Sequence, residues 1–301
     1  MANFTAEERR KYIGGSDISA VMGMNRWKTP LQLWLEKTGE VEPKDLSQVE
    51  AVQLGIELEE FVAQKFARET GKQVRVQSKM YVHKDYPFMT AHIDRLIVGG
   101  DELLECKTCS AFKKDEWEND GIPQEYVLQV MWYMGITGRK KAWIAVLIGG
   151  QSFKYKEVEF DQELFDIMVE RAKNFWNCVQ NNIPPEISVN DGETLREMFP
   201  KHSNDIVEDL EADQEIAYYQ ELKNTISEQK TELELLGAKI KNRIQGNLGI
   251  STPKYIATWK EQNSSKVDTQ KLAKDGLLEK YSIHYSYRVL KIKNNPEMQV
   301  A

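Results

Sequence analysis

The sequence has no long apolar run, few cysteines and a negative net charge. No stretch approaches the roughly 18 consecutive apolar residues of a membrane-spanning helix, and the opening MANFTAEERRKY lacks the apolar core of a secretory signal. The 3 cysteines are an odd number, which predicts a reducing cytoplasm. A net charge of -7 argues against a protein that coats nucleic acid through its overall charge. Membrane, secreted and nucleic-acid-coating proteins are therefore not expected.

The composition that remains is that of a soluble globular protein. A chain of 301 residues, 41% hydrophobic and 29% charged, can hold one large domain, or a medium domain with an appendage. Cys106 and Cys109 have the spacing of half a zinc or redox site, but no second ligand pair accompanies them. Neither a zinc site nor a redox site is expected here.

One stretch, residues 90–107, carries the strongest chemical signal. It predicts a β-hairpin with a turn at Gly99 and Gly100. Because side chains alternate along a strand, Glu105 and Lys107 share one face, and antiparallel pairing can bring Asp94 opposite them. Two carboxylates and an ammonium group would then meet at one point.

That grouping is typical of a site that binds a hard divalent cation and hydrolyses a phosphodiester. Mg²⁺ is usually held by one or two protein carboxylates, water and substrate phosphate. A nearby lysine can orient or deprotonate water, or stabilise charge in the transition state. The pattern is short, so a surface hairpin with solvated charges is the competing interpretation.

Upstream, residues 5–12 predict a short helix that leads into the segment IGGSDISAVMG. Ser16 or Asp17 is a good N-cap there, and a helix start with a hydroxyl group and arginines nearby suits an anion such as a DNA phosphate. The alternative is a tight turn capped by its own serine. Further helices are expected over 18–23, 29–40, 48–70, 125–138, 161–180 and 205–244, and strands over 73–83, 141–150, 153–160, 255–260 and 284–293.

Several segments in order resemble the YqaJ-type viral recombinase nucleases, which are relatives of the lambda-type alkaline exonucleases in the PD-(D/E)XK superfamily. The segments are RRKYIGGSDISAVMG, LGIELEEFVA, AHIDR, LECKT, YVLQVMWYMGITG and WIAVLIGG, within residues 9–150. The helix ending in FWNCV followed by PPE also matches, as does the tail phrase TWKEQNSSKVDTQKL with YRVLKIK, and together the segments cover about two thirds of the chain.

The resemblance implies a metal centre. Asp94 and Glu105 would be metal ligands together with the backbone carbonyl of Cys106, and Glu59 would be the upstream glutamate of the centre. Lys107 would be the catalytic lysine. The implied cofactor is Mg²⁺, as two ions, with Mn²⁺ able to substitute.

The resemblance also implies contacts to DNA. Gln129 would touch the active-site groups or a phosphate, although a core-edge amide satisfied by backbone is the alternative from the sequence. Arg9 and Ser16 would bind the 5′-terminal phosphate. The family often places histidine where this chain has Trp132, so that histidine's role does not transfer, and Trp132 is expected in core packing or a stacking surface.

The implied fold is α/β (α+β): a PD-(D/E)XK restriction-endonuclease-like core with a mixed central sheet flanked by helices over 1–200. A long helical arm and a small α/β tail over 201–301 would serve oligomer or partner contacts. The implied activity is 5′-to-3′ digestion of one strand of duplex DNA, leaving 3′ overhangs for a single-strand annealing protein. The resemblance also implies a trimeric or tetrameric ring. The protein would act in the cytoplasm of a bacterial host and be encoded by a phage or prophage. The alternatives are an endonuclease or repair nuclease of the same superfamily, and a non-catalytic scaffold that binds DNA ends.

Overall fold

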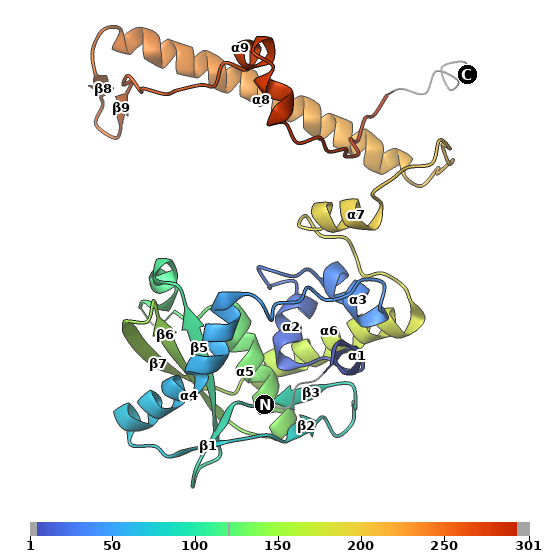
Figure 1. Cartoon of the computed structure of the whole chain (residues 1–301), viewed down its shortest axis with the longest axis vertical. Helices are drawn as coiled ribbons and strands as arrows, with labels where there is room; N and C mark the ends of the chain where they lie inside the picture. The colour runs from blue at the N-terminus through green and yellow to red at the C-terminus, as the bar shows by residue number, and fades with distance from the viewer. Residues whose placement is uncertain (1–4, 120, 294–301) are drawn as a thin grey trace. The chain divides into compact units, whose positions relative to one another are not determined.

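A mixed five-stranded sheet is the centre of the N-terminal part of the chain (Figure 1). The computed structural model describes residues 5–119 and 121–293. The strand order is β1-β4-β5-β6-β7, with β5 and β6 parallel and the other neighbours antiparallel. The strands are β1 (Val74–Val76), β4 (Arg95–Ile97), β5 (Glu102–Cys109), β6 (Lys141–Ile148) and β7 (Ser152–Glu159). The predicted mixed central sheet is confirmed.

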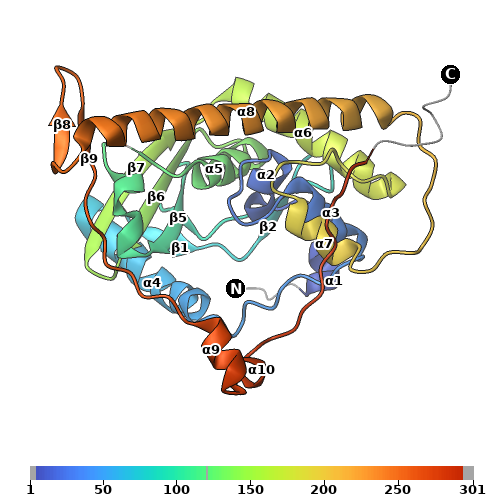
Figure 2. The ribbon, with the colours of Figure 1, turned by 90° about the horizontal axis from the view of Figure 1, so that it is seen from above.

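Helices cover both faces of this sheet (Figures 1 and 2). The helix α4 (Glu50–Thr70) packs on one face against β5 and β6, and α5 (Gln124–Thr137) packs on the other. Beyond α5 lie α2 (Gly15–Val21) and α6 (Gln162–Asn181), with α3 (Pro30–Thr38) against both. The flanking helices of the predicted core are therefore present, and α5 is the helix that faces the side chains of Glu105 and Lys107.

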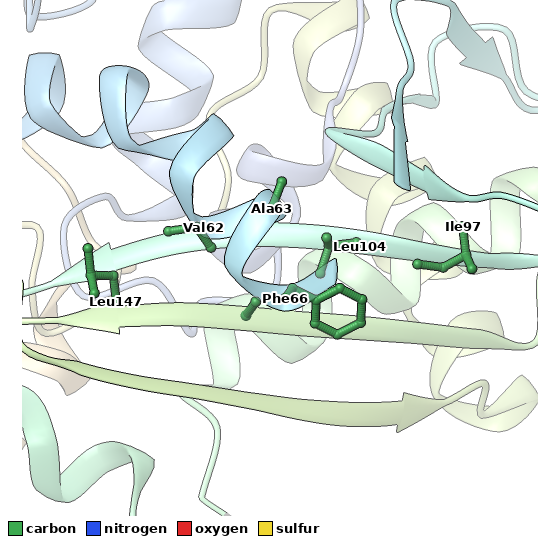
Figure 3. Packing of buried hydrophobic residues seen from close by; sticks show 7 residues of the cluster. Val62, Ala63, Phe66, Ile97, Leu104 and Leu147 are labelled. Atoms are coloured by element: carbon green, nitrogen blue, oxygen red, sulfur yellow. The ribbon is translucent and has the colours of Figure 1, made fainter. Parts of the chain in front are cut away.

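The amphipathic pattern of α4 explains how this helix is fixed to the sheet. Val62 and Ala63 are neighbours, Phe66 follows one helical turn later, and all three side chains are fully buried. They belong to one buried cluster with Leu104 and Leu147 of the sheet (Figure 3). Fully burying a large apolar side chain contributes roughly 1.5–3 kcal/mol, so this contact anchors the helix that carries the predicted Glu59.

Two predicted strands are each divided in the structure. The predicted strand 73–83 forms β1 and a separate strand, β2 (Met80–Val82), which pairs with β3 (Thr90–His92). The first arm of the predicted hairpin stops at Ile93 and Asp94, between β3 and β4. The reason is pairing: β3 joins β2 while β4 joins the main sheet, so the chain must change direction between them.

The connection after β5 contains one regular element. Residues 111–117 form the 3₁₀ helix η1 (Ala111–Trp117), whose first turn is capped by the Ser110 hydroxyl accepting from Phe112 N–H. Short helices α1 (Ala6–Arg9) and α7 (Gly192–Met198) complete this part of the chain.

The chain divides into two compact units, between Glu197 and Met198; the sequence analysis placed a boundary at residue 200. The second unit contains α8 (Asp213–Ile244), the hairpin of β8 (Gly249–Ser251) and β9 (Ile256–Thr258), and the short helices α9 (Thr269–Lys274) and α10 (Leu277–Lys280).

Two predictions for the second unit are wrong. The helix α8 begins later than predicted, because the Asp209 carboxylate accepts the N–H groups of Glu211 and Ala212 in a turn before the helix. Residues 284–293 form no strand in the described structure, since an alternating pattern does not by itself supply a partner strand. No helix among the described residues is long and apolar enough to cross a membrane.

Candidate active site

Asp94 lies at the break between β3 and β4, directly beyond the paired part of β4 and β5. The register Arg95 to Leu104, extended by one residue, sets Asp94 opposite Glu105. The Asp94 Oδ2 atom accepts the backbone N–H of Cys106 at 3.0 Å. The carboxylate thus takes the place of a strand partner at this position, which is the convergence that the hairpin pattern predicted.

Glu105, Lys107 and Gln129 form a connected hydrogen-bond network. The Lys107 Nζ donates to Glu105 Oε1 at 2.5 Å and to Gln129 Oε1 at 3.0 Å. The Gln129 Nε2 donates to the same Glu105 oxygen at 2.7 Å. Gln129 is therefore bonded to side chains of the predicted site, and the alternative of an amide satisfied by backbone is not what the structure has.

Two tyrosines of α5 extend this network, and the sequence analysis did not single them out. The hydroxyl of Tyr133 accepts from Gln129 Nε2 at 2.8 Å. The ring of Tyr126 lies with its centroid 4.9 Å from Lys107 Nζ, within range of a cation–π interaction. The spacing of Tyr126, Gln129 and Tyr133 on one helical stripe was the available signal, because residues three and four apart share a helix face.

The buried carboxylates shift the proton affinities of the site. Burial raises the pKa of Asp94 to about 7, and the charge of Glu105 adds to the rise, against the effect of Lys107. Burial alone would lower the pKa of Lys107, but the carboxylates of Glu105 and Asp94 more than offset it, so the pKa is raised. Lys107 is therefore held in its charged form. The positive charge around Asp94 is not enough to offset the cost of burying its negative charge.

This charge imbalance fits a divalent cation. The Oε2 atom of Glu105 is buried and has no hydrogen-bond partner. A buried carboxylate oxygen without a donor is costly unless a cation or water meets it. No group of three or more His, Cys, Asp and Glu side chains arranged to hold a metal occurs in the described residues. Asp94 and Glu105 offer carboxylate oxygens, and such donors suit an ion such as Mg²⁺, which takes few protein ligands and keeps water or substrate oxygens.

Glu59 is held by an arginine. Its Oε1 atom receives Arg95 Nη1 at 2.5 Å, while Arg95 Nη2 reaches Glu60 Oε2 at 2.9 Å. Burial and the charge of Asp94 raise the pKa of Glu59, and Arg95 opposes them. Glu59 thus lies within electrostatic range of Asp94, but its carboxylate is engaged. Arg95 follows Asp94 on the strand, so its side chain points to the opposite face of the sheet, towards α4. The alternation of side chains and the glutamates of α4 were the sequence signals for this ion pair.

The predicted phosphate-binding residues lie on the first two helices. Arg9 ends α1 and Ser16 is in the first turn of α2, and both are exposed. The expectation that Ser16 or Asp17 caps α2 is wrong: the N-cap is Gly14, whose N–H is accepted by Asp17 Oδ2 at 3.1 Å. The helix begins at Gly15, three residues before the expected start at residue 18, because Gly14 takes the extended cap conformation.

A buried lysine fastens the segment between these helices. The Lys37 Nζ donates to the carbonyl oxygens of Arg9 and Tyr12 and to Asp17 Oδ2, at 2.7, 2.7 and 2.8 Å. All three ammonium hydrogens thus have acceptors. The backbone that carries Arg9 and leads to Ser16 is held in a fixed conformation.

The N-terminus of α2 also touches the network of the candidate site. A Cβ atom on Gly15 would lie 2.2 Å from Tyr133 Cε1, so only glycine allows this approach. Tyr133 in turn bonds Gln129. The predicted phosphate-binding turn and the carboxylate–lysine network are therefore joined through one buried tyrosine.

This contact makes a matched pair of alanine variants informative. Gly15→Ala is expected to lower the free energy of unfolding by about 1–3 kcal/mol and to lower the activity of the candidate site, because overpacking must displace Tyr133. Gly14→Ala is the control for the contact, since its Cβ would meet no atom closer than 3.9 Å and only the ordinary cost of alanine at an N-cap is expected. Urea unfolding and initial rates measure both effects; equal behaviour of the two variants would contradict the role assigned to the contact.

Trp132 is a core residue. It is fully buried and its Nε1 atom donates to the carbonyl oxygen of Thr90 at 2.9 Å. Of the two expectations for this residue, core packing is the one that the structure has.

Comparison with known proteins places this site in context. Residues 6–140 match the model of the YqaJ-like viral recombinase domain. The chain is 40% identical over 272 residues to the uncharacterized protein YqaJ of Bacillus subtilis (strain 168), a match that covers 88% of this chain and 85% of that protein.

Two solved structures resemble part of the chain. An alkaline exonuclease from Laribacter hongkongensis, LHK-Exo, has a TM-score of 0.49 and 19% identity, covering 63% of this chain and 94% of that one. A phage-related exonuclease from Haemophilus somnus 129PT has a TM-score of 0.45 and 15% identity, covering 57% and 95%.

Proposed function

The chain belongs to the YqaJ-like viral recombinase family, and from that membership and the geometry of its site we propose that it is a Mg²⁺-dependent exonuclease that digests one strand of duplex DNA from the 5′ end. The observation that carries the proposal is the meeting of Asp94, Glu105 and Lys107, with one Glu105 oxygen buried and unpartnered. Carboxylates that lack compensation beside a fixed ammonium group suit metal-assisted hydrolysis of a phosphodiester.

In this proposal Asp94, Glu105 and the carbonyl oxygen of Cys106 hold the metal. When bound, Mg²⁺ would activate water and stabilise the leaving oxygen. Lys107, kept protonated by the two carboxylates, donates a hydrogen bond to the charge that develops on the phosphate. Gln129 accepts from Lys107 Nζ and so orients it. A second ion near Glu59 would share this carboxylate with Arg95, which is bonded to its Oε1 atom.

Arg9 and Ser16 are proposed to bind the 5′-terminal phosphate. Both are exposed, at a turn that contacts Tyr133 through Gly15. A guanidinium and a hydroxyl group together suit a phosphate dianion. Holding the new 5′ phosphate after each cleavage would advance the enzyme by one nucleotide.

Arg9→Ala is expected to reduce digestion of 5′-phosphorylated ends about tenfold and to change digestion of 5′-hydroxyl ends little, since one charge-assisted contact is worth roughly 1.5–3 kcal/mol. Initial rates on the two duplexes measure the effect. Arg10→Ala is the control, because Arg10 is engaged with Glu36 and Glu42 within the protein. Equal loss on both kinds of end would remove Arg9 from phosphate recognition.

The second unit is proposed to make oligomer contacts in a trimeric or tetrameric ring, or to recruit a single-strand annealing protein. Its helix α8 exposes apolar side chains at heptad-like spacing, namely Tyr219, Leu222, Ile226, Leu233, Leu236 and Ile240. Analytical ultracentrifugation of the whole chain tests the ring, and a monomer at all concentrations would contradict it.

The decisive assay for the proposed activity uses a linear duplex with a different label on each 5′ and 3′ end. With Mg²⁺, release of 5′ nucleotides and survival of the 3′-labelled strand are expected, and a closed circle should stay intact. Cleavage of the circle would favour an endonuclease or repair nuclease. DNA-end binding without Mg²⁺-dependent nucleotide release would favour a non-catalytic scaffold.

A further inference from the structure

Two large aromatic side chains are exposed near the end of the strand that carries Lys107. Trp27, in the turn between α2 and α3, is 76% exposed, and Phe112, in η1, is 98% exposed. Both side chains belong to residue types that a folded protein usually buries at least in part. The proposed cleavage reaction as described uses neither of them.

The turn that carries Trp27 is fastened to the elements of the candidate site. Arg26 makes an ion pair with Glu116 of η1 at 2.8 Å and a second with Glu125 of α5 at 2.8 Å. The ammonium group of Lys113, also in η1, lies 5.0 Å from the centroid of the Trp27 ring. The turn is therefore fixed to η1 and α5 by the two ion pairs of Arg26, and the Trp27 ring contacts η1 through a cation–π interaction.

This surface borders the candidate active site. The helix η1 begins two residues after β5 ends at Cys109, and β5 carries Lys107. Glu125, which binds Arg26, precedes Tyr126, whose ring lies 4.9 Å from Lys107 Nζ. Within η1, Trp117 stacks against the same tyrosine with ring centroids 5.8 Å apart. Through Arg26, Glu125 and Tyr126, the turn that carries Trp27 is thus connected to the proposed catalytic lysine.

We propose that Trp27, Phe112 and Lys113 form a stacking surface for unpaired bases of single-stranded DNA. The proposal rests on the proposed function, because a nuclease that removes one strand of a duplex leaves unpaired bases next to its active site. Aromatic side chains stack on any base, and lysines between them attract the backbone. Two exposed aromatic rings, one of them in contact with an ammonium group, suit bases and phosphates better than the continuous apolar face of a protein partner.

The binding test uses the whole protein in EDTA, so that cleavage does not interfere, with two fluorescent probes: a 20-nucleotide oligothymidylate and an abasic strand of the same length. Trp27→Ala and Phe112→Ala are each expected to weaken oligothymidylate binding about tenfold, within the range of alanine effects on stacked bases, and to change abasic-strand binding little. Trp27→Phe should restore most of the affinity, because phenylalanine still stacks. Fluorescence anisotropy gives the dissociation constants.

Both side chains are exposed, so the variants are expected to fold, and thermal unfolding checks this. Unchanged oligothymidylate binding in both alanine variants would overturn the proposal, as would an equal loss on the abasic strand, which would indicate charge attraction or a structural effect. An aromatic surface that serves a protein partner would give the first of these results. Because binding is read without cleavage, an inactive wild-type protein that shows base-dependent binding would contradict the nuclease and leave the stacking surface standing.

Discussion

Lys107→Ala is expected to abolish DNA cleavage, with a loss of at least about 10³-fold, while the protein stays folded and binds DNA ends. The ammonium group contacts both Glu105 and Gln129, and its pKa is raised by the carboxylates around it. Without it, no side chain that the structure shows bonded to this network, within residues 5–119 and 121–293, carries the positive charge that the developing phosphate charge needs. Single-turnover cleavage of a labelled duplex measures the loss.

Two variants make the Lys107 result specific. Lys84→Ala is the control, because that side chain is 86% exposed and belongs to the turn after β2. Lys107→Arg keeps the charge but not the compact geometry of an ammonium group, so only partial rescue is expected. Full cleavage by Lys107→Ala would exclude the lysine from the reaction.

Asp94→Asn is expected to lose activity by a similar factor and yet to be more stable than the wild type when metal is removed. Burial and Glu105 raise the pKa of Asp94 to about 7, which means that its charged form is unfavourable in the folded protein. An amide oxygen can still accept the N–H of Cys106. The substitution therefore removes an uncompensated charge and keeps a hydrogen bond.

The raised pKa of Asp94 makes the free energy of unfolding depend on pH. The folded-state pKa of Asp94 is higher than the ordinary value of about 3.9, so its contribution favours folding at low pH and is lost as pH rises towards 7. In EDTA the free energy of unfolding of the wild type should fall between about pH 4 and pH 7, and Asp94→Asn should flatten that fall. Added Ca²⁺ should stabilise the wild type alone. Equal pH profiles for the two proteins would contradict a buried, charged Asp94.

Much of the candidate site follows from strand geometry. Alternation of side chains fixes Glu105 and Lys107 on one face, and closure at Gly99 sets Asp94 opposite Glu105. The apolar periodicity around Gln129 predicts a helix, and the right-handed crossover between parallel strands brings that helix over the face with Glu105. Local pattern and chain connectivity were sufficient for this part.

The remainder depends on partners distant in sequence. Arg95 reaches Glu59 across 36 positions, and Gly15 approaches Tyr133 across more than 100, so neither contact leaves a local pattern. Propensity cannot choose which of several acids an arginine will bind. Nor did the sequence indicate that Trp27 and Phe112 are exposed. An aromatic residue in a turn or short helix can be buried or exposed, and only the structure shows which.

The central claim is that Asp94 and Glu105 jointly hold a divalent cation beside the scissile phosphate. Anomalous diffraction from crystals of the protein with a DNA end and Mn²⁺ tests it most directly. The predicted result is an anomalous peak coordinated by both carboxylates and by a phosphate oxygen, with Lys107 next to that phosphate. A fully loaded complex with no peak between these two carboxylates would contradict the account.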